Sequence, residues 1–299
     1  MTAAERSQRH PVRSSLLADF ERLLAARLER LEWRDAQSAG GALGRAAWRL
    51  SRRERGRALE HLAIAFPDLQ QEVRERLGRA AFEHLGVVLA ECLWLRDRGR
   101  AEIPRHVLLR GGERIAAARA TGRPLLFVTG HCGNWELLAA RIACGLELAV
   151  VARELDEPGF QEELLAFRAR FGTRTIVRGT PGAARELLRT LRSGGALGML
   201  IDQDTRVEGV WVDFFGRPAW TPSGAADLAL RFRAIVLPVF IERLADGSHR
   251  VDVEPELELT DDATAATQAM TAAIEAQIRR VPEQWVWMHR RWRRRPPGE

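Results

Sequence analysis

The chain of 299 residues contains no lysine, no tyrosine, only three cysteines and a single asparagine, Asn134. Cys92, Cys132 and Cys144 show no Cys-x-x-Cys spacing, which argues against a disulfide framework or a zinc site. No stretch approaches the roughly 18 consecutive apolar residues that a membrane-spanning helix needs, and the first residues lack the pattern of a signal peptide. These absences predict a protein that stays in a reducing cytoplasm or lies on a membrane without crossing it.

The chain is rich instead in apolar residues and arginine. Hydrophobic residues make up 46% of it, all 46 basic residues are arginine, and the formal net charge is +6. This composition is typical of a globular protein. A positive surface is most often simply solvated, but it also suits nucleic acid or anionic lipid headgroups. Because no nucleic-acid-binding motif accompanies the charge, a partner nucleic acid is not expected.

The first third of the chain is predicted to be helical. Apolar residues recur at helical spacing over Ser15–Glu32, with arginines between them. This amphipathic helix is expected either to pack on the protein body or to lie in a lipid interface. Further helices are predicted over Ala42–Leu62 and over Gln71–Trp94, after a break at Pro67. Residues 1–95 are therefore predicted to form a helical cap on a single domain that spans the whole chain.

Residues 96–299 alternate between strand and helix patterns, which predicts an α/β core. The expected architecture is a mixed central sheet of about seven strands flanked by helices, with a final short helix from Pro282 to Trp292. The predicted strands are Pro124–Thr129, Leu146–Val151, Arg174–Val177, Leu197–Asp202, Val210–Phe214, Ile235–Ile241 and Arg250–Val253, and the predicted helices are Glu113–Ala120, Trp135–Cys144, Gly159–Phe171, Gly182–Arg192, Ser223–Arg231 and Asp262–Arg280.

A histidine and an acidic residue follow the first buried strand, in the segment Gly130-His131-Cys132-Gly133-Asn134-Trp135-Glu136. Asn134 is predicted to be the N-cap of the next helix, and Glu136 lies in its first turn, where the helix dipole favours a carboxylate. Because His131 precedes the helix, the chain can fold back and bring Glu136 to the imidazole. Such a pair allows the other ring nitrogen to remove a hydroxyl proton. From the spacing alone, a capped helix after a strand-end histidine is the alternative.

Two other chemistries at this segment have less support. Cys132 beside His131 suggests a thiol nucleophile, but adjacent side chains at a strand end point apart, and a buried cysteine is commoner than a reactive one. A metal bound by His131 and Glu136 lacks the further ligands that a site requires.

Four blocks, in order, resemble the lipid A late (secondary) acyltransferases, within the lysophospholipid and glycerolipid acyltransferase superfamily. Gly130-His131-x4-Glu136 resembles the His-x4-Asp/Glu signature, and Leu200-Ile201-Asp202-Gln203-Asp204 resembles a strand-end Asp-x-Asp. Phe214-Phe215-Gly216-Arg217-Pro218, followed by Thr221-Pro222, resembles the next block. Pro282–Arg291 is close to the C-terminal Pro-Glu-Gln-aromatic-x-Trp-x-His-Arg-Arg. The set spans about residues 50–297 and agrees with the mixed sheet predicted above.

The resemblance implies an O-acyltransferase in which His131, held by Glu136, deprotonates a hydroxyl of a membrane lipid such as a lipid A precursor. The oxygen would attack the thioester of an acyl-acyl carrier protein or acyl-CoA, with no metal or other cofactor. Backbone N–H groups around Gly133, or an arginine, would stabilise the negative charge that develops.

The resemblance also implies a set of substrate-binding residues. Arginines would bind phosphates of the acceptor or of pantetheine, and Asp202 would orient Arg153 or Arg170. The residues assigned to substrate binding are Gly133, Asn134, Arg153, Arg168, Arg170, Asp202 and Asp204.

One departure from the family limits what the resemblance implies. Relatives that make lipid A usually begin with a spanning helix, whereas this chain has only the amphipathic Ser15–Glu32 segment. Lysophospholipid, aminolipid or glycolipid acceptors therefore stay open, and peripheral attachment to the cytoplasmic face of the bacterial inner membrane is expected. A thioester hydrolase using the same pair is the main alternative, and a non-enzymatic protein that binds nucleic acid or membranes through its charge is the second.

Overall fold

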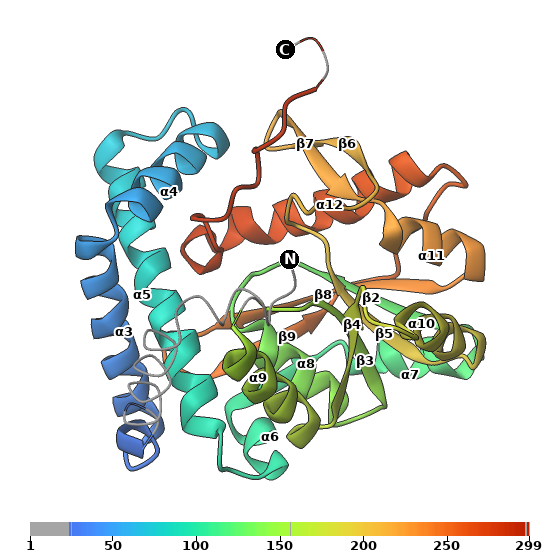
Figure 1. Ribbon diagram of the computed structural model, residues 1–299, viewed down its shortest axis with the longest axis horizontal. Coiled ribbons are helices and arrows are strands. Elements are labelled where there is room, and N and C mark those ends of the chain that lie inside the picture. Colours follow the sequence, from blue (N-terminus) through green and yellow to red (C-terminus); the bar gives the residue numbers. More distant parts are fainter. Residues whose placement is uncertain (1–23, 25, 156, 297, 299) are drawn as a thin grey trace.

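A seven-stranded sheet lies at the centre of the computed structural model, which describes residues 24, 26–155, 157–296 and 298 (Figure 1). The strand order is β1-β9-β8-β2-β5-β3-β4, and every neighbouring pair is parallel except β8 with β9. The predicted mixed sheet is therefore confirmed. Its strands are β1 (Val107–Arg110), β2 (Leu125–Thr129), β3 (Leu148–Arg153), β4 (Thr173–Arg178), β5 (Ala196–Leu200), β8 (Ile235–Arg243) and β9 (His249–Val253).

The membership of the sheet differs from the prediction at one strand. The predicted strand Val210–Phe214 corresponds to β6 (Gly209–Phe214), which pairs only with β7 (Arg217–Pro222) in a separate antiparallel hairpin. The seventh strand of the sheet is instead β1, whose four residues are too few to show a periodic pattern. The two prolines of β7 argued against a strand in the sequence, but a two-stranded hairpin has free edges where proline is tolerated.

Two apolar cores cover the opposite faces of the sheet. Leu125 and Phe127 of β2 point to the core under α7 and α8, whereas Leu126 and Val128 point to the core under α11 and α12. The alternation follows from the two-residue period of a strand. The helices of this part of the chain are α6 (Ile103–His106), α7 (Gly112–Ala120), α8 (Trp135–Ala143), α9 (Pro158–Arg170), α10 (Ala183–Arg192), α11 (Gly224–Phe232) and α12 (Ala263–Arg280), with a short 3-10 helix η1 (Arg100–Glu102).

Three helices form a layer beside the sheet, coloured blue to cyan in Figure 1. They are α3 (Trp33–Leu50), α4 (Arg52–Ala65) and α5 (Gln71–Leu95), so the predicted helix Ala42–Leu62 is wrong in its bounds and is two helices. Glycine lies inside α3 because the two long helices nearly touch: a Cβ on Gly40 would lie 2.4 Å from the Gly86 carbonyl oxygen of α5. Glycine therefore permits this close contact.

The expected amphipathic helix Ser15–Glu32 lies largely outside the described residues. Of the part that is described, residues 24 and 26–28 are helical, and Leu28 is buried in the core that also contains Trp94 of α5. Among the residues that the structure describes, no helix is both long enough and apolar enough to cross a membrane.

The C-terminal block does not form the predicted helix. A 3-10 helix, η2 (Pro282–Gln284), is followed by irregular chain, in which Trp285, Trp287 and Arg291 are fully buried. Side-chain hydrogen bonds hold this segment in place: Trp285 donates to Asp202 at 2.8 Å, and Arg291 donates to the Trp220 carbonyl at 2.6 Å. These tertiary contacts override the local helical pattern and place the block behind the sheet edge where His131 lies.

Candidate active site

His131 and Asp202 lie at the same edge of the sheet. His131 follows β2 and Asp202 follows β5, and these two strands pair in parallel with Thr129 opposite Leu200. The carboxyl ends of adjacent parallel strands meet at one edge, which is where open α/β sheets generally bind their ligands. The topology therefore brings together two residues that are 71 positions apart in the sequence.

Asp202 holds both the ring and the backbone of His131. One carboxylate oxygen lies 2.7 Å from His131 Nδ1, and the other accepts a hydrogen bond of 2.7 Å from the His131 backbone N–H. The second oxygen also accepts the indole N–H of Trp285. The carboxylate that is hydrogen-bonded to the imidazole is thus Asp202 rather than Glu136. The bonds of Asp202 run to His131 and Trp285, whereas the sequence had suggested Arg153 or Arg170 as its partner.

The environment of Asp202 favours its ionised form. Burial by itself raises the pKa of Asp202, but the nearby His131 charge and the hydrogen bonds from His131 and Trp285 outweigh burial and hold that pKa below its ordinary value. With Nδ1 donating to an ionised carboxylate, the neutral ring carries its lone pair on Nε2. The His131 side chain is 22% exposed, and the amide nitrogen of Gln203 lies 3.1 Å from both ring nitrogens.

Glu136 is engaged by an arginine. Both of its carboxylate oxygens accept hydrogen bonds from Arg168, at 2.8 and 2.7 Å, in a bidentate pair that joins the first turn of α8 to the last turns of α9. Neither a hydrogen bond nor an ion pair joins His131 and Glu136, although both line the same cavity. Burial by itself lowers the pKa of Arg168, but the hydrogen bond and charge of Glu136 outweigh burial and raise that pKa above its ordinary value. The guanidinium therefore stays charged.

The turn between His131 and Glu136 is enclosed by protein. Asn134 is the N-cap of α8, as predicted, and its side-chain oxygen accepts the Leu137 N–H at 3.2 Å. The Gly133 N–H, expected to stabilise negative charge on a substrate, instead donates to the Gln284 carbonyl at 2.8 Å. Cys132 is buried, and burial together with the Asp202 charge raises its pKa well above the ordinary value. The thiol is therefore protonated at neutral pH, which is the wrong state for a nucleophile.

Position 133 also requires glycine. Its φ of +58° lies in the left-handed region, and a Cβ there would lie 2.2 Å from the Ile241 carbonyl oxygen. The turn can therefore approach β8 only with glycine at this position.

The other predicted substrate-binding residues divide into two groups. Arg153, Arg168 and Arg170 line the cavity that contains His131. Asp204 does not: its side chain is fully buried and forms ion pairs with Arg293 and Arg294, so it fixes the C-terminal segment.

This cavity has a volume of about 830 Å³ and a mixed lining. Apolar side chains come from α5, including Leu85, Val88 and Leu89, and from α9, including Phe160 and Phe167. Charged and polar side chains gather at the strand ends, where His131, Gln203, Arg153 and Arg178 contribute. No group of three metal-ligating side chains occurs among the described residues. The arrangement suits a ligand with a long apolar part and a polar head near His131.

The sequence missed three contributors to this site. Trp285 and Gln203 both contact the His131–Asp202 pair, and Arg178 lines the cavity. The blocks that contain Trp285 and Gln203 were visible in the sequence, but nothing local indicated which of their side chains would face the histidine, and Arg178 lies in none of the blocks. Arg178 lies opposite Arg153 in the β3–β4 register, a relationship that only the strand pairing defines.

Comparison with known proteins agrees with the four blocks. The family model for bacterial lipid A biosynthesis acyltransferases matches residues 25–294. The chain is 26% identical over 264 residues to a lipid A biosynthesis acyltransferase of Haemophilus influenzae, covering 87% of this chain and 82% of the relative. It is 29% identical over 265 residues to the lipid A biosynthesis myristoyltransferase of Escherichia coli, covering 86% and 80%.

A further relative differs in its acceptor. A phosphatidylinositol mannoside acyltransferase of Mycolicibacterium smegmatis is 26% identical over 184 residues, which is 60% of each chain. Because the family model covers nearly the whole sequence, this chain belongs to the bacterial lipid A biosynthesis acyltransferase family.

Proposed function

We propose that this protein transfers a fatty acyl group from an acyl thioester, carried by acyl carrier protein or CoA, to a hydroxyl of a lipid A precursor or a related glycolipid. His131 is the general base and Asp202 the carboxylate that orients it. The supporting observation is the hydrogen bond of 2.7 Å between His131 Nδ1 and Asp202. It fixes the ring so that Nε2, the basic nitrogen, is the one left for an acceptor hydroxyl.

The reaction follows from that arrangement. As Nε2 takes the hydroxyl proton, the acceptor oxygen attacks the thioester carbon, the C–S bond breaks and an ester and a free thiol form. Negative charge develops on the thioester oxygen, and we assign its stabilisation to the amide of Gln203, which lines the cavity beside His131. Asp202 remains ionised and stabilises the imidazolium.

The Glu136–Arg168 pair has a supporting role in this proposal. Its bidentate geometry ties α9 to α8, and both side chains line the cavity. A carboxylate that already accepts two charge-assisted bonds is a poor proton acceptor. We assign the pair to holding the cavity wall, with Arg153 and Arg170 as binders of substrate phosphate.

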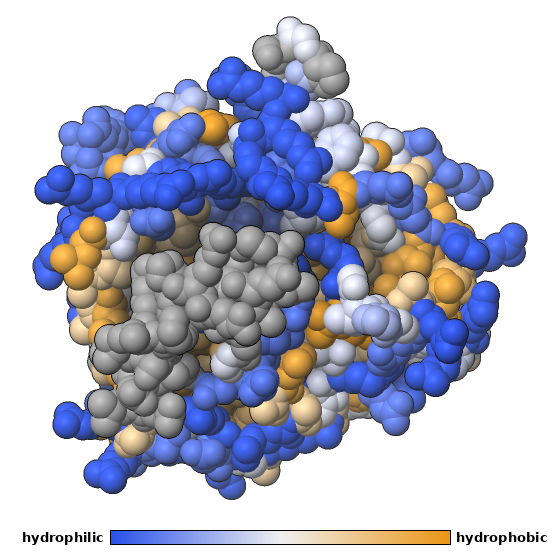
Figure 2. All heavy atoms as spheres, in the orientation of Figure 1, coloured by the Kyte–Doolittle hydropathy of each residue, from blue (hydrophilic) through white to orange (hydrophobic). Residues whose placement is uncertain are grey.

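Apolar side chains at the cavity suit both an acyl chain and contact with a membrane surface. Leu89 and Phe160 are large apolar side chains that are exposed to solvent and also line it. Hydrophilic residues predominate on the face shown in Figure 2, with smaller apolar patches between them. We infer peripheral attachment at the cytoplasmic face of the bacterial inner membrane, with exposed apolar side chains toward the lipid and arginines toward anionic headgroups.

The same residues would serve a thioester hydrolase if water replaced the lipid hydroxyl. The large apolar lining does not separate the two reactions, because both need an acyl-chain site. Product analysis separates them: transfer yields an acylated lipid, whereas hydrolysis yields free fatty acid at the same rate with or without acceptor.

Replacement of His131 by alanine tests the proposal. We expect kcat for acyl transfer to fall by about 10³-fold or more, because general-base catalysis typically contributes about 10²–10⁴, with the rate divided by the folded fraction from circular dichroism. The assay is mass spectrometry of acylated lipid from an acyl thioester and a lipid A precursor. Undiminished transfer by His131→Ala would refute the mechanism.

A further inference from the structure

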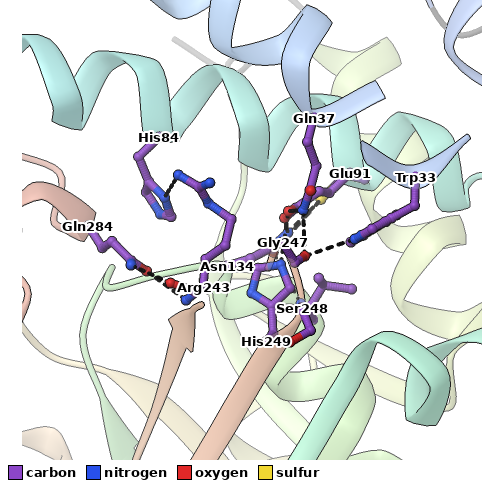
Figure 3. Close-up of polar contacts among 12 residues, drawn as sticks. Trp33, Gln37, His84, Glu91, Asn134, Arg243, Gly247, Ser248, His249 and Gln284 are labelled. Carbon is purple, nitrogen blue, oxygen red and sulfur yellow. Dashed lines mark hydrogen bonds and ion pairs between the residues drawn. The ribbon is translucent and has the colours of Figure 1, made fainter. Parts of the chain in front are cut away.

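Behind the turn that carries His131 lies a polar cluster that the mechanism above does not use. Its centre is Glu91, on α5, with no exposure to solvent at all. Figure 3 shows side chains from three other parts of the chain converging on this carboxylate: Gln37 from α3, Asn134 from the turn before α8, and His249 from the start of β9.

Each of these three side chains donates to Glu91. Gln37 Nε2 lies 2.7 Å from Oε1, His249 Nε2 lies 2.9 Å from Oε1, and Asn134 Nδ2 lies 2.8 Å from Oε2. Burial by itself raises the pKa of Glu91, but the His249 charge and the hydrogen bonds from its three partners outweigh burial and hold that pKa below its ordinary value. The carboxylate is therefore ionised at neutral pH and acts only as an acceptor.

An acceptor-only partner fixes the orientation of the Asn134 amide. With Nδ2 committed to Glu91, the oxygen Oδ1 must face the helix, where it accepts the Leu137 N–H. That bond caps α8 and begins the turn that contains Glu136. On the other side, Asn134 is three residues from His131 in a turn held by the Gly133 bond to Gln284.

We infer that Glu91 is a positioning residue of the acyl-transfer site, which acts by fixing the side chain of Asn134 and through it the turn between His131 and Glu136. This inference rests on the proposed function. Glu91 itself does not line the cavity that contains His131, whereas its neighbour Cys92 does. A carboxylate of the N-terminal helical layer thereby helps to set the geometry of the active site.

The hydrogen-bond directions supply a specific test. In Glu91→Gln the oxygen can still accept from Gln37 and His249, but the new NH2 group then faces the NH2 of Asn134, donor against donor. If Asn134 rotates its amide to relieve this contact, it loses the cap to Leu137. In Asn134→Asp the cap is kept, but a second carboxylate oxygen faces Glu91 Oε2, and two buried carboxylates repel.

The double variant Glu91→Gln/Asn134→Asp restores every bond. The carboxylate introduced at position 134 would accept both the Leu137 N–H and the new NH2 group at position 91, while the amide oxygen at position 91 accepts from Gln37 and His249. We expect each single variant to lower kcat roughly 10- to 100-fold with KM nearly unchanged, since small misplacements of reacting groups have effects of this order. The double variant should recover kcat to within about threefold of wild type, because the two substitutions compensate each other's loss.

The matched control is Glu83→Gln, on the same helix. Glu83 forms a half-exposed ion pair with Arg45, so the same chemical change there should leave kcat as in wild type. All rates are measured at pH 8 and well below the melting temperature, and are divided by the folded fraction from circular dichroism. Wild-type kcat in folded single variants would overturn the inference, and so would a folded double variant no faster than the singles. If a single variant fails to fold, the comparison of kcat between the double variant and wild type decides by itself.

A second readout does not depend on acyl transfer. Because Asn134 is the only asparagine in the chain, labelling with ¹⁵N-asparagine gives one side-chain amide pair in an NMR spectrum. We expect these signals to exchange slowly with solvent, to shift in Glu91→Gln and to remain unchanged in Glu83→Gln. An Asn134 signal that does not respond to Glu91→Gln overturns the positioning role. If neither wild type nor any variant transfers acyl groups while the expected NMR shifts are seen, the result would instead count against the proposed function.

Discussion

Two of the histidine–carboxylate pairs among the described residues have nearly the same distance and different surroundings. His131 Nδ1 lies 2.7 Å from Asp202, and His249 Nε2 lies 2.9 Å from Glu91. In both pairs the carboxylate is buried. The difference is in the imidazole: the His131 side chain is 22% exposed and lines a cavity, whereas the His249 side chain has no exposure.

This difference separates the proposed general base from a histidine with a structural role. A histidine held by a carboxylate can transfer a proton only if its second nitrogen meets a substrate. The Nε2 of His131 can meet one, since the ring lines the cavity. The second nitrogen of His249, Nδ1, is buried without a hydrogen-bond partner among the described residues. The same pairing chemistry would therefore serve the proposed catalysis at one place and the architecture of the turn at the other.

The largest expected effect comes from breaking the first pair. Asp202→Asn keeps the shape of the side chain but removes the charge that fixes the His131 tautomer, so we expect kcat to fall on the order of 10²–10⁴-fold. Glu136→Gln, which leaves the His131–Asp202 bond intact, should lower kcat about tenfold or less. The measurement is acyl transfer at saturating substrate, with folding checked by circular dichroism.

The pair of variants also decides which carboxylate orients the histidine. A larger loss in Glu136→Gln than in Asp202→Asn would restore the sequence-based assignment of Glu136 as the orienting residue. It would mean that substrate binding rearranges the bonds seen between Glu136 and Arg168.

Breaking the second pair should change stability more than rate. His249→Leu leaves the buried Glu91 carboxylate with two donors, and removing one partner of a buried ion pair typically destabilises by about 3–5 kcal/mol. We expect the free energy of unfolding in urea to fall by about 3 kcal/mol, while kcat of the folded enzyme stays within about twofold of wild type because the Glu91–Asn134 bond remains. A rate loss as large as that of Asp202→Asn would erase the distinction between the two pairs.

The smallest effect concerns a histidine that has no carboxylate partner. Burial, with the charge of Arg243 beside it, lowers the pKa of His84 from 6.5 to about 4. Because the folded pKa is the lower one, the unfolded chain binds the proton more tightly. The contribution of neutral His84 to the free energy of unfolding is complete above pH 6.5 and is lost as the pH falls toward 4. For one group the loss is at most about 1.4 kcal/mol per pH unit.

Urea unfolding at pH 7 and pH 5 measures this dependence. Wild type should be less stable at pH 5, and His84→Gln should show a shallower pH dependence by about one proton. Glu83→Gln, one residue away on the same helix, should keep the wild-type dependence. A wild-type slope in His84→Gln would show that His84 is not the group that titrates. His289, whose pKa burial and the His131 charge also lower to about 4, would then be the first alternative.

Much of the fold was predictable because its patterns are local. The apolar run of β2, the N-cap Asn134 and the helices α8 to α12 each follow from residues within one element. Two of the failures have local causes too, and the third has a tertiary cause. β1 is too short for a pattern, β7 contains two prolines, and the C-terminal block is held by contacts with Asp202 and with the β6–β7 hairpin rather than by its own helical tendency.

The sequence by itself determined that His131 stands at a strand end with an acidic residue five positions later, and that four ordered blocks resemble one acyltransferase family. It could not determine which carboxylate reaches the imidazole. The tertiary structure decided that, because the parallel pairing of β2 with β5 places Asp202 beside His131, while α9 brings Arg168 to Glu136. Spacing along a chain limits what a local turn can join, whereas strand order selects among residues that are distant in sequence, and only the folded sheet fixes that order.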